Sequence, residues 1–210
     1  MSQDNITIFE HDNGVTHFHH RTFTVNIFGN KVYTTVTRRA SVVRKWIYKI
    51  RYDHRFRRDR LVVGLGVQWR PPMSNKVATP QLCVGRQCLI FQIIHSNSIP
   101  LVLMRFLAND FITFVGVRNQ IDSYLLRRDY NLAVDRVLEL GSVADFLRGA
   151  SMETMASEIL DFHGIKKPRW IGRSDWDNWW LSKDQVQYAC VDAHLSLEIG
   201  KKLNVWSILF

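Results

Sequence analysis

The chain begins with segments in which apolar and polar residues alternate, the pattern of strands with one buried face. Two pairs of such segments, each joined by a short turn, predict β-hairpins: residues 16–26 with 31–38, and residues 81–85 with 88–93. Three further runs predict strands, at residues 61–69, 112–117 and 136–140. The first two of these are apolar almost throughout, which is typical of strands covered on both faces of a sheet.

Apolar residues at helical spacing predict helices between and after these strands. The clearest stripe consists of Val42, Val43, Trp46, Ile47 and Ile50. Further helices are expected at residues 100–109, 120–128 and in most of the chain beyond residue 140, with a loop at 166–175. Strands first and then strands that alternate with helices indicate an α/β domain built on a mixed sheet.

Composition narrows the class of protein. With 210 residues, of which 46% are hydrophobic, the chain is long enough for one sizeable core. No apolar run approaches the roughly 18 residues of a membrane span, so no membrane association is expected. The cysteines Cys83, Cys88 and Cys190 are odd in number and lack CxxC spacing, which favours neither a disulfide framework nor a zinc site. A reducing compartment, nucleus or cytoplasm, is therefore expected.

The positive charge is concentrated in one segment. The formal net charge is +9, and the segment from Arg38 to Arg60 holds ten Lys and Arg residues against two Asp. Four of these cations lie off the apolar stripe of the helix: Arg44, Lys45, Lys49 and Arg51. A basic helix surface attracts phosphate backbones without sequence preference, so these four residues are predicted to bind nucleic acid. A solvated helix face and contact with an acidic protein remain the alternatives.

Candidate chemistry lies near the end of the chain. Tyr188 and Asp192 are four residues apart in a stretch with helical spacing, residues 181–199, and so share one helix face. A carboxylate placed there can hold a metal ion while the phenol points into the same pocket. Without further support, an ordinary amphipathic helix explains the spacing equally well.

Two earlier segments supply that support. Asp122 follows the strand FVGV in a predicted helix, and the strand RLVVGLGVQW carries Gly66 and Gln68 at alternate positions on one side. Together with the Tyr188 segment, and in this order, they resemble the three motifs of the tyrosine-type DEDD (DEDDy) 3′–5′ exonucleases. The similarity extends to plant Werner-like exonuclease domains and covers residues 20–210. Residues 1–19 are left as an N-terminal extension.

The resemblance implies a fold and a mechanism. The fold is the RNase H-like (DnaQ-like) one, a mixed β-sheet flanked by α-helices. Family members hydrolyse phosphodiesters with two metal ions, Mg²⁺ or Mn²⁺, held by four carboxylates. Asp122 and Asp192 match two of these ligands, and Tyr188 matches the residue that positions the attacking water. The other two positions hold Gly66 and Gln68, so a weak or incomplete metal site and impaired hydrolysis are expected.

Three functions stay open at this point. The first is a weakly active 3′–5′ exonuclease on single-stranded RNA or DNA. The second is a catalytically silent nucleic-acid-binding or assembly subunit, since relatives form rings and the C-terminal residues NVWSILF could supply an interface. The third is an adaptor for an acidic protein. Minor possibilities are base stacking on Trp170, Trp176, Trp179 and Trp180, a lost ligand replaced by Glu153 or Glu158, and a metal at His17 and His19.

Overall fold

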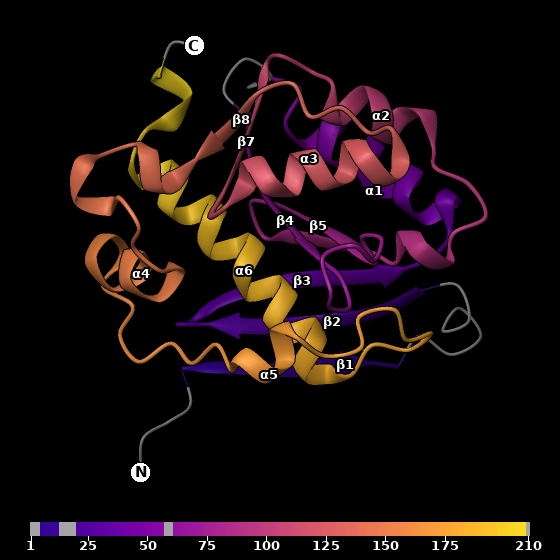
Figure 1. Cartoon of the computed structure of the whole chain (residues 1–210), viewed down its shortest axis with the longest axis horizontal. Coiled ribbons are helices and arrows are strands. Elements are labelled where there is room, and N and C mark those ends of the chain that lie inside the picture. Colours follow the sequence, from indigo (N-terminus) through magenta and orange to yellow (C-terminus); the bar gives the residue numbers. More distant parts are fainter. Residues whose placement is uncertain (1–4, 13–19, 57–60, 209–210) are drawn as a thin grey trace.

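A single eight-stranded sheet forms the centre of the molecule (Figure 1). The computed structural model describes residues 5–12, 20–56 and 61–208. In spatial order the strands are β1 (Ile6–His11), β2 (His20–Ile27), β3 (Asn30–Thr37), β6 (Gln87–Phe91), β5 (Thr79–Val84), β4 (Leu61–Gln68), β7 (Ile112–Gly116) and β8 (Val137–Glu139).

The sheet is mixed, as the sequence predicts. The antiparallel pairs are β1–β2, β2–β3, β5–β6 and β4–β5, whereas β3–β6, β4–β7 and β7–β8 are parallel. The two predicted hairpins are therefore present as β2–β3 and β5–β6. The expected start of β2, residues 16–19, lies outside the described residues.

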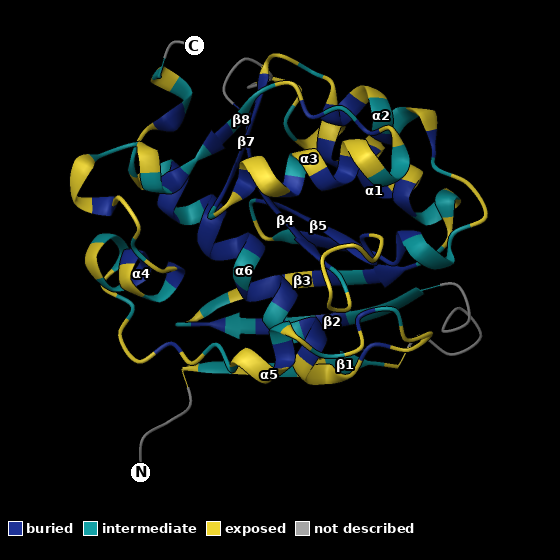
Figure 2. Ribbon diagram, viewed as in Figure 1, coloured by how far each residue is buried: buried dark blue, intermediate teal, exposed yellow. Residues whose placement is uncertain are grey.

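Helices cover both faces of the sheet. The long helix α6 (Lys183–Lys202) contacts every strand from β1 to β7, and α4 (Met152–Leu160) and α5 (Arg169–Gly172) pack beside it. The opposite face is covered by α1 (Ala40–Asp53), α2 (Leu101–Leu107) and α3 (Asn119–Tyr130). Figure 2 shows the buried residues between these layers. The described residues also contain four short 3₁₀ helices: Ile93–His95, Leu140–Ser142, Asp145–Leu147 and Val205–Ser207.

Strand β4 shows how the sequence separates the two cores. Leu61, Val63 and Val67 point into the core beneath α1, α2 and α3, whereas Val62 points into the core beneath α6. Because side chains alternate along a strand, Gly64, Gly66 and Gln68 share the α6 side. The sequence pattern of this strand thus fixes which residues face α6.

Local sequence signals explain where α1 and α6 form. Val43, Trp46, Ile47 and Ile50 of the predicted stripe are buried under α1, and the basic residues face outward. At the start of α6, Ser182 and Gln185 form a capping box, in which each side chain bonds the backbone N–H of the other residue. This cap fixes the first turn of the helix that carries Tyr188 and Asp192.

Three features differ from the sequence-based expectation. Strand β1 lies within the residues assigned to an N-terminal extension, but it is hydrogen-bonded to β2 along its whole length and forms the sheet edge. Pro100 caps α2 from outside the helix and is not in its first turn. The expected loop at 166–175 contains the four-residue helix α5. The four residues of α5 are too few for helical periodicity to stand out, and the position of a helix end is uncertain by one or two residues.

The three cysteines are free and buried. They come from β5, β6 and α6 and pack together, with Cys88 contacting both Cys83 and Cys190, and Cys83 Sγ lying 3.8 Å from His194 Nδ1. In the described residues no group of three His, Cys, Asp or Glu side chains is placed to hold a metal ion. No helix in the same residues is long and apolar enough to cross a membrane.

Candidate active site

A cleft of about 760 Å³ opens at the carboxyl end of β4, between α3, α4, α5 and α6. It brings together residues of all three segments singled out in the sequence: Gly66, Gln68, Asp122, Tyr188 and Asp192. These positions span more than a hundred residues of the chain, from 66 to 192. Their convergence at one end of the sheet identifies the cleft as the candidate active site.

The position of Asp192 depends on a close approach between α6 and β4. A Cβ atom on Gly64 would overlap the backbone carbonyl oxygen of Ala193, so only glycine lets the helix lie this close to the strand. Four residues further along β4, Gln68 Nε2 donates to Asp192 Oδ2 at 3.5 Å. The first and third motifs therefore meet, although the strand contributes an amide where the family pattern has a carboxylate.

Asp122 reaches the cleft from the first turn of α3 and is buried. Burial raises its pKa well above the usual range, and the neighbouring Asp192 carboxylate raises it further. The backbone N–H of Val67 opposes the shift by hydrogen bonding. A carboxyl group in this environment binds a proton readily and would be stabilised as an anion by a cation in the cleft.

Asp192 already has a cation beside it. Lys167 Nζ forms an ion pair with Asp192 Oδ1, and the two side chains are only 14% and 19% exposed. The same ammonium lies 4.9 Å from the centre of the Tyr188 ring. Burial alone would lower the pKa of Lys167, but attraction to Asp192 and Tyr188 outweighs it, and the pKa is raised. The lysine is therefore charged. This role of Lys167 could not be predicted from the sequence because the residue lies in a segment without periodicity.

The Tyr188 hydroxyl is confined by its surroundings. A Cβ on Gly172 of α5 would come within 2.8 Å of that oxygen, so α5 lies directly against the phenol. Burial raises the pKa of Tyr188, although the adjacent Lys167 ammonium opposes the shift. The phenol thus stays protonated and can donate a hydrogen bond into the cleft.

The space beside Gly66 is filled from the neighbouring strand. Gly66 is paired with Gln81 across β4 and β5, and a Cβ at position 66 would lie 2.9 Å from Gln81 Oε1. Gln81 is fully buried, and its Nε2 donates to the backbone oxygen and Oγ1 of Thr79 at 2.8 and 2.9 Å. Its Oε1 has no hydrogen-bond partner in the described part of the chain. A neutral amide therefore lies next to the position where the family pattern has an aspartate.

Four acidic residues line the cleft from different elements. Asp122, Asp192, Glu139 and Glu153 all line it, but no three of them are placed to share an ion within the described residues. Glu139 accepts hydrogen bonds from the backbone nitrogens of Asn119 (2.8 Å) and Gly141 (3.5 Å). Glu153 reaches the cleft, whereas Glu158 on the same helix does not line it. Asp122 and Asp192 are the two cleft residues that match carboxylates of the family pattern.

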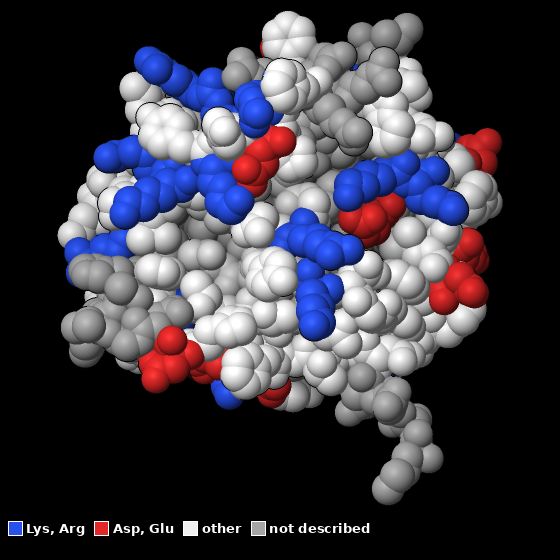
Figure 3. All heavy atoms as spheres, turned by 180° about the vertical axis from the view of Figure 1, so that it is seen from behind, with Lys and Arg blue, Asp and Glu red and all other residues white. Residues whose placement is uncertain are grey.

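The predicted nucleic-acid-binding residues lie elsewhere. Arg44, Lys45, Lys49 and Arg51 are exposed on α1, across the sheet from α6, and none of them lines the cleft. Figure 3 shows basic side chains gathered along this part of the rear surface. Lys49 is paired with Asp53 at 2.6 Å. The cleft has its own cations, which the sequence analysis did not single out: Arg118, Lys167, Arg169 and Arg173.

The remaining aromatic and histidine candidates separate into two groups. Trp176 is fully buried and donates to the backbone oxygen of Ile171, so it is a packing residue. Trp179 and Trp180 flank the Arg38 guanidinium at 3.9 and 5.0 Å, and Trp170 is exposed. His17 and His19 lie outside the described residues.

The C-terminal segment packs against this chain itself. Val205 is buried in the core beneath α6, and Trp206 and Ile208 pack against that core. In the segment suggested as an oligomer interface, Asn204 and Ser207 are exposed, and residues 209–210 are not described.

Comparison with known proteins agrees with this architecture. A model of the 3′–5′ exonuclease family matches residues 70–206. An Arabidopsis thaliana protein named 3′-5′ exonuclease is 32% identical over 151 residues, which cover 68% of this chain and 52% of that protein. The mouse (Mus musculus) bifunctional 3′-5′ exonuclease/ATP-dependent helicase WRN is 31% identical over 160 residues, 70% of this chain and 11% of that protein. The solved structure of Brucella melitensis NrnC has a TM-score of 0.57 at 19% identity and covers 70% of this chain and 74% of that one.

The mixed sheet flanked by helices, with the three motif segments at one end, defines an RNase H-like domain. The chain belongs to the 3′–5′ exonuclease family. The resemblance to plant and Werner-type exonucleases is thereby confirmed. The family match begins at residue 70, so the strand with Gly66 and Gln68 lies just before it. The matched region of this chain spans about half of the plant relative.

Proposed function

We propose that this chain is a 3′–5′ exonuclease domain that binds the 3′ end of single-stranded RNA or DNA in the cleft but hydrolyses phosphodiesters weakly. The observation that carries the proposal is the meeting of Asp122, Tyr188 and Asp192 with Gly66 and Gln68 in one cleft. Three of the positions keep the family's chemistry, and the two on β4 do not.

The residues of the cleft have separate roles in this proposal. Asp122 and Asp192 hold one Mg²⁺ or Mn²⁺ weakly, because two carboxylates and a neutral amide give fewer hard oxygen ligands than such ions prefer. A bound ion would neutralise phosphate charge. Tyr188 donates a hydrogen bond from its protonated hydroxyl, and the cations Arg118, Arg169 and Arg173 attract the phosphates of the strand. A nucleic-acid end can therefore be held even where hydrolysis is slow.

The exposed cations of α1 extend the attraction beyond the cleft. Arg44, Lys45, Lys49 and Arg51 form a surface that provides long-range attraction to any phosphate backbone. The free cysteines support the nucleus or cytoplasm as its location.

Salt-dependent binding to single-stranded oligonucleotides tests the proposal. Reversing the four α1 cations to Glu should weaken binding of all sequences alike and flatten the slope of log affinity against log salt, by about 0.7 for each lost phosphate contact. A matched control reverses four exposed cations elsewhere, Lys31, Arg86, Lys183 and Lys202, and has the same net charge. Equal losses of affinity in both variants would show that the net charge of the protein, and not the α1 surface, governs binding. Absence of binding by the wild-type chain at low salt would refute the proposed function.

A further inference from the structure

A second groove lies at the opposite end of β4 from the cleft. It has a volume of about 680 Å³ and is formed by the ends of α1 and α2 and the starts of β4 and β7. The groove is lined by Leu61 at the start of β4 and the cleft by β4 residues from Leu65 onward, so about 13 Å of strand, four residues at about 3.3 Å each, lies between the two sites. The groove is thus a separate surface of the molecule.

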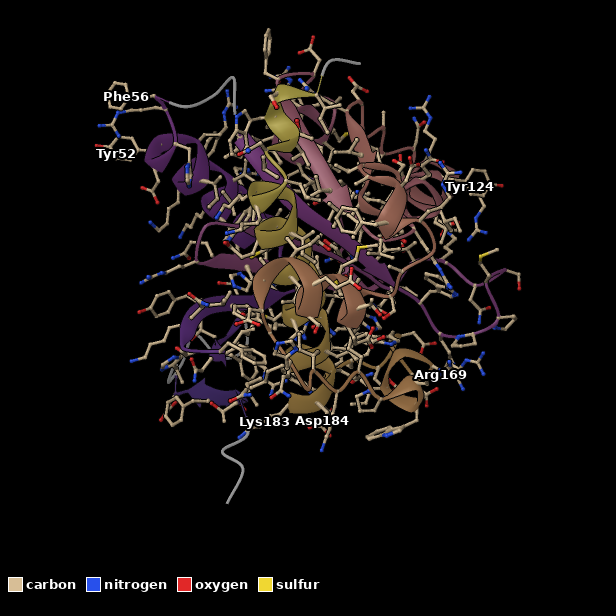
Figure 4. All side chains as sticks on the ribbon, turned by 90° about the vertical axis from the view of Figure 1, so that its left-hand side faces the viewer. Tyr52, Phe56, Tyr124, Arg169, Lys183 and Asp184 are labelled. Carbon is tan, nitrogen blue, oxygen red and sulfur yellow. The ribbon has the colours of Figure 1, made fainter. Side chains whose placement is uncertain are left out.

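Aromatic side chains at the rim of this groove are exposed to solvent. Phe56 is 85% exposed and Phe111 is 62% exposed, and both line the groove. Tyr52, 66% exposed, lies one turn before Phe56. Figure 4 shows Tyr52 and Phe56 projecting together from the end of α1, on the side opposite Tyr124 and Arg169. Large apolar rings held in water without a partner usually mark a binding surface.

Arg55 lies between two of these rings. Its guanidinium carbon is 4.4 Å from the centre of the Tyr52 ring and 4.5 Å from that of Phe56, and Nη1 donates to the Tyr52 backbone oxygen at 2.9 Å. These contacts hold the planar group and the rings as one stacked unit. The outer face of Phe56 remains open for a further planar group.

The charge of the groove selects the kind of partner. Arg51, Arg55 and Arg105 line it, and none of the three forms an ion pair within the described residues. No acidic side chain from this part of the chain lines the groove. Unpaired guanidinium groups next to exposed rings match a ligand that alternates anionic phosphates with planar bases.

We propose that this groove is a second binding site for single-stranded nucleic acid, in which a base stacks on Phe56 and Tyr52 while Arg51 and Arg105 hold the adjacent phosphates. The inference rests on the proposed function, because it concerns the same substrate class. It assigns base stacking to the end of α1, away from the tryptophan cluster. A strand whose 3′ end lies in the cleft and whose upstream part reaches the groove would be held at both sites.

Fluorescence anisotropy with two labelled strands of twenty nucleotides, an oligothymidylate and its abasic counterpart, tests the groove. Replacing Tyr52 and Phe56 together by Ala should weaken oligothymidylate binding about tenfold and leave abasic binding unchanged. Phe56→Trp should keep the wild-type affinity. Tyr124→Ala, an exposed tyrosine on α3 that lines neither site, is the matched control and should have no effect. The melting temperature of each variant confirms that the fold is intact.

Four outcomes would overturn the inference. The Tyr52/Phe56 double variant could bind oligothymidylate as tightly as the wild type while Arg173→Glu, in the cleft, binds it more weakly. That result would support the proposed function but show that the groove takes no part in binding. Equal losses for both strands would show that the rings do not stack bases. Competition by polyglutamate as strong as that by the oligonucleotide would indicate an acidic protein as the partner. Failure of the wild-type chain to bind either strand would refute the proposed function as well.

Discussion

Gln81 occupies the space that any side chain larger than hydrogen at position 66 would need. The Gln81 Oε1 atom lies 2.9 Å from the place of a Cβ on Gly66, and the two residues are direct neighbours across β4 and β5. The amide is held at its nitrogen by Thr79, whereas its oxygen has no partner in the described residues. Position 66 therefore lacks the carboxylate of the family pattern, and the Gln81 side chain fills the space that this carboxylate would need.

This relationship changes what is needed to restore the site. An aspartate at position 66 can enter only if the Gln81 amide rotates away. The atom in the way is the end of a flexible side chain, so rotation breaks the hydrogen bonds of Nε2 to Thr79 but none of Oε1. A smaller residue at position 81 should ease the substitution, so Gln81→Ala is a useful companion to Gly66→Asp.

Gly64→Ala should destabilise the fold strongly. The added methyl group would overlap the backbone oxygen of Ala193, and a backbone atom of α6 moves only with the helix. We expect a loss of at least about 3 kcal/mol in the free energy of unfolding, measured by denaturant titration. Gly141→Ala is the control, because the added Cβ would lie 3.4 Å from its nearest neighbour, the backbone oxygen of Leu147. This variant should change the free energy of unfolding by less than about 1 kcal/mol. Similar small effects at both sites would show that α6 does not depend on Gly64.

Asp122→Asn should stabilise the metal-free protein at neutral and alkaline pH. Burial raises the pKa of Asp122 above its value in the unfolded chain. At a pH above that raised pKa, the folded protein must hold a buried, ionised carboxylate, which lowers its stability. The penalty fades as pH falls through the raised pKa, and below the ordinary value of about 4 it is absent. Asp122→Asn removes this penalty. At neutral and alkaline pH its melting temperature should therefore exceed that of the wild type by about 2–4 °C, the shift that roughly 1 kcal/mol produces in a domain of this size.

The pH dependence distinguishes this cause from general packing effects. The difference in melting temperature between the Asp122→Asn variant and the wild type should narrow steadily as pH is lowered from 8 toward 5. Asp110→Asn, at an exposed position outside the cleft, should match the wild type throughout. A constant difference across this range, or a less stable Asn variant, would show that Asp122 is not penalised by burial.

Lys167→Met should destabilise the protein by about 3 kcal/mol, because it leaves the Asp192 carboxylate without its cation in a poorly exposed site. The neighbouring Lys166 is exposed, so Lys166→Met should have little effect. Mn²⁺ should raise the melting temperature of Lys167→Met more than that of the wild type, since the ion can then take the place of the ammonium beside Asp192. Equal responses to Mn²⁺ in both proteins would contradict this competition.

The sequence predicts the frame of the site well. Gly66 and Gln68 lie on one strand face because strands alternate, and Tyr188 and Asp192 share a helix face because they are four residues apart. Both relationships are local and need no knowledge of the tertiary fold. The order of elements then indicated the mixed sheet, which the structure confirms.

The details that decide the chemistry are non-local. Gln81 meets Gly66 through strand pairing between β5 and β4, and no spacing in the sequence specifies that a neighbouring side chain fills the gap. Lys167 reaches Asp192 from an irregular segment 25 residues earlier. The groove beside Phe56 is formed by four elements, and the sequence predicted a binding role only for α1, because of its positive charge. Such contacts follow from tertiary packing and could not be read from periodicity.

We propose that Gly66 and Gln68 limit hydrolysis in an otherwise complete exonuclease cleft. The most direct measurement is nucleotide release from single strands labelled at the 3′ or the 5′ end, with Mg²⁺ or Mn²⁺, by folded wild-type and Gly66→Asp/Gln68→Glu proteins. We predict that the wild type trims slowly and that the double variant, alone or with Gln81→Ala, raises metal-dependent 3′–5′ trimming by at least about tenfold. Gly66→Asp alone should contribute more than Gln68→Glu alone. Double and triple variants that melt at the wild-type temperature but show no metal-dependent trimming would contradict the claim, as would a wild type that already trims as fast as they do.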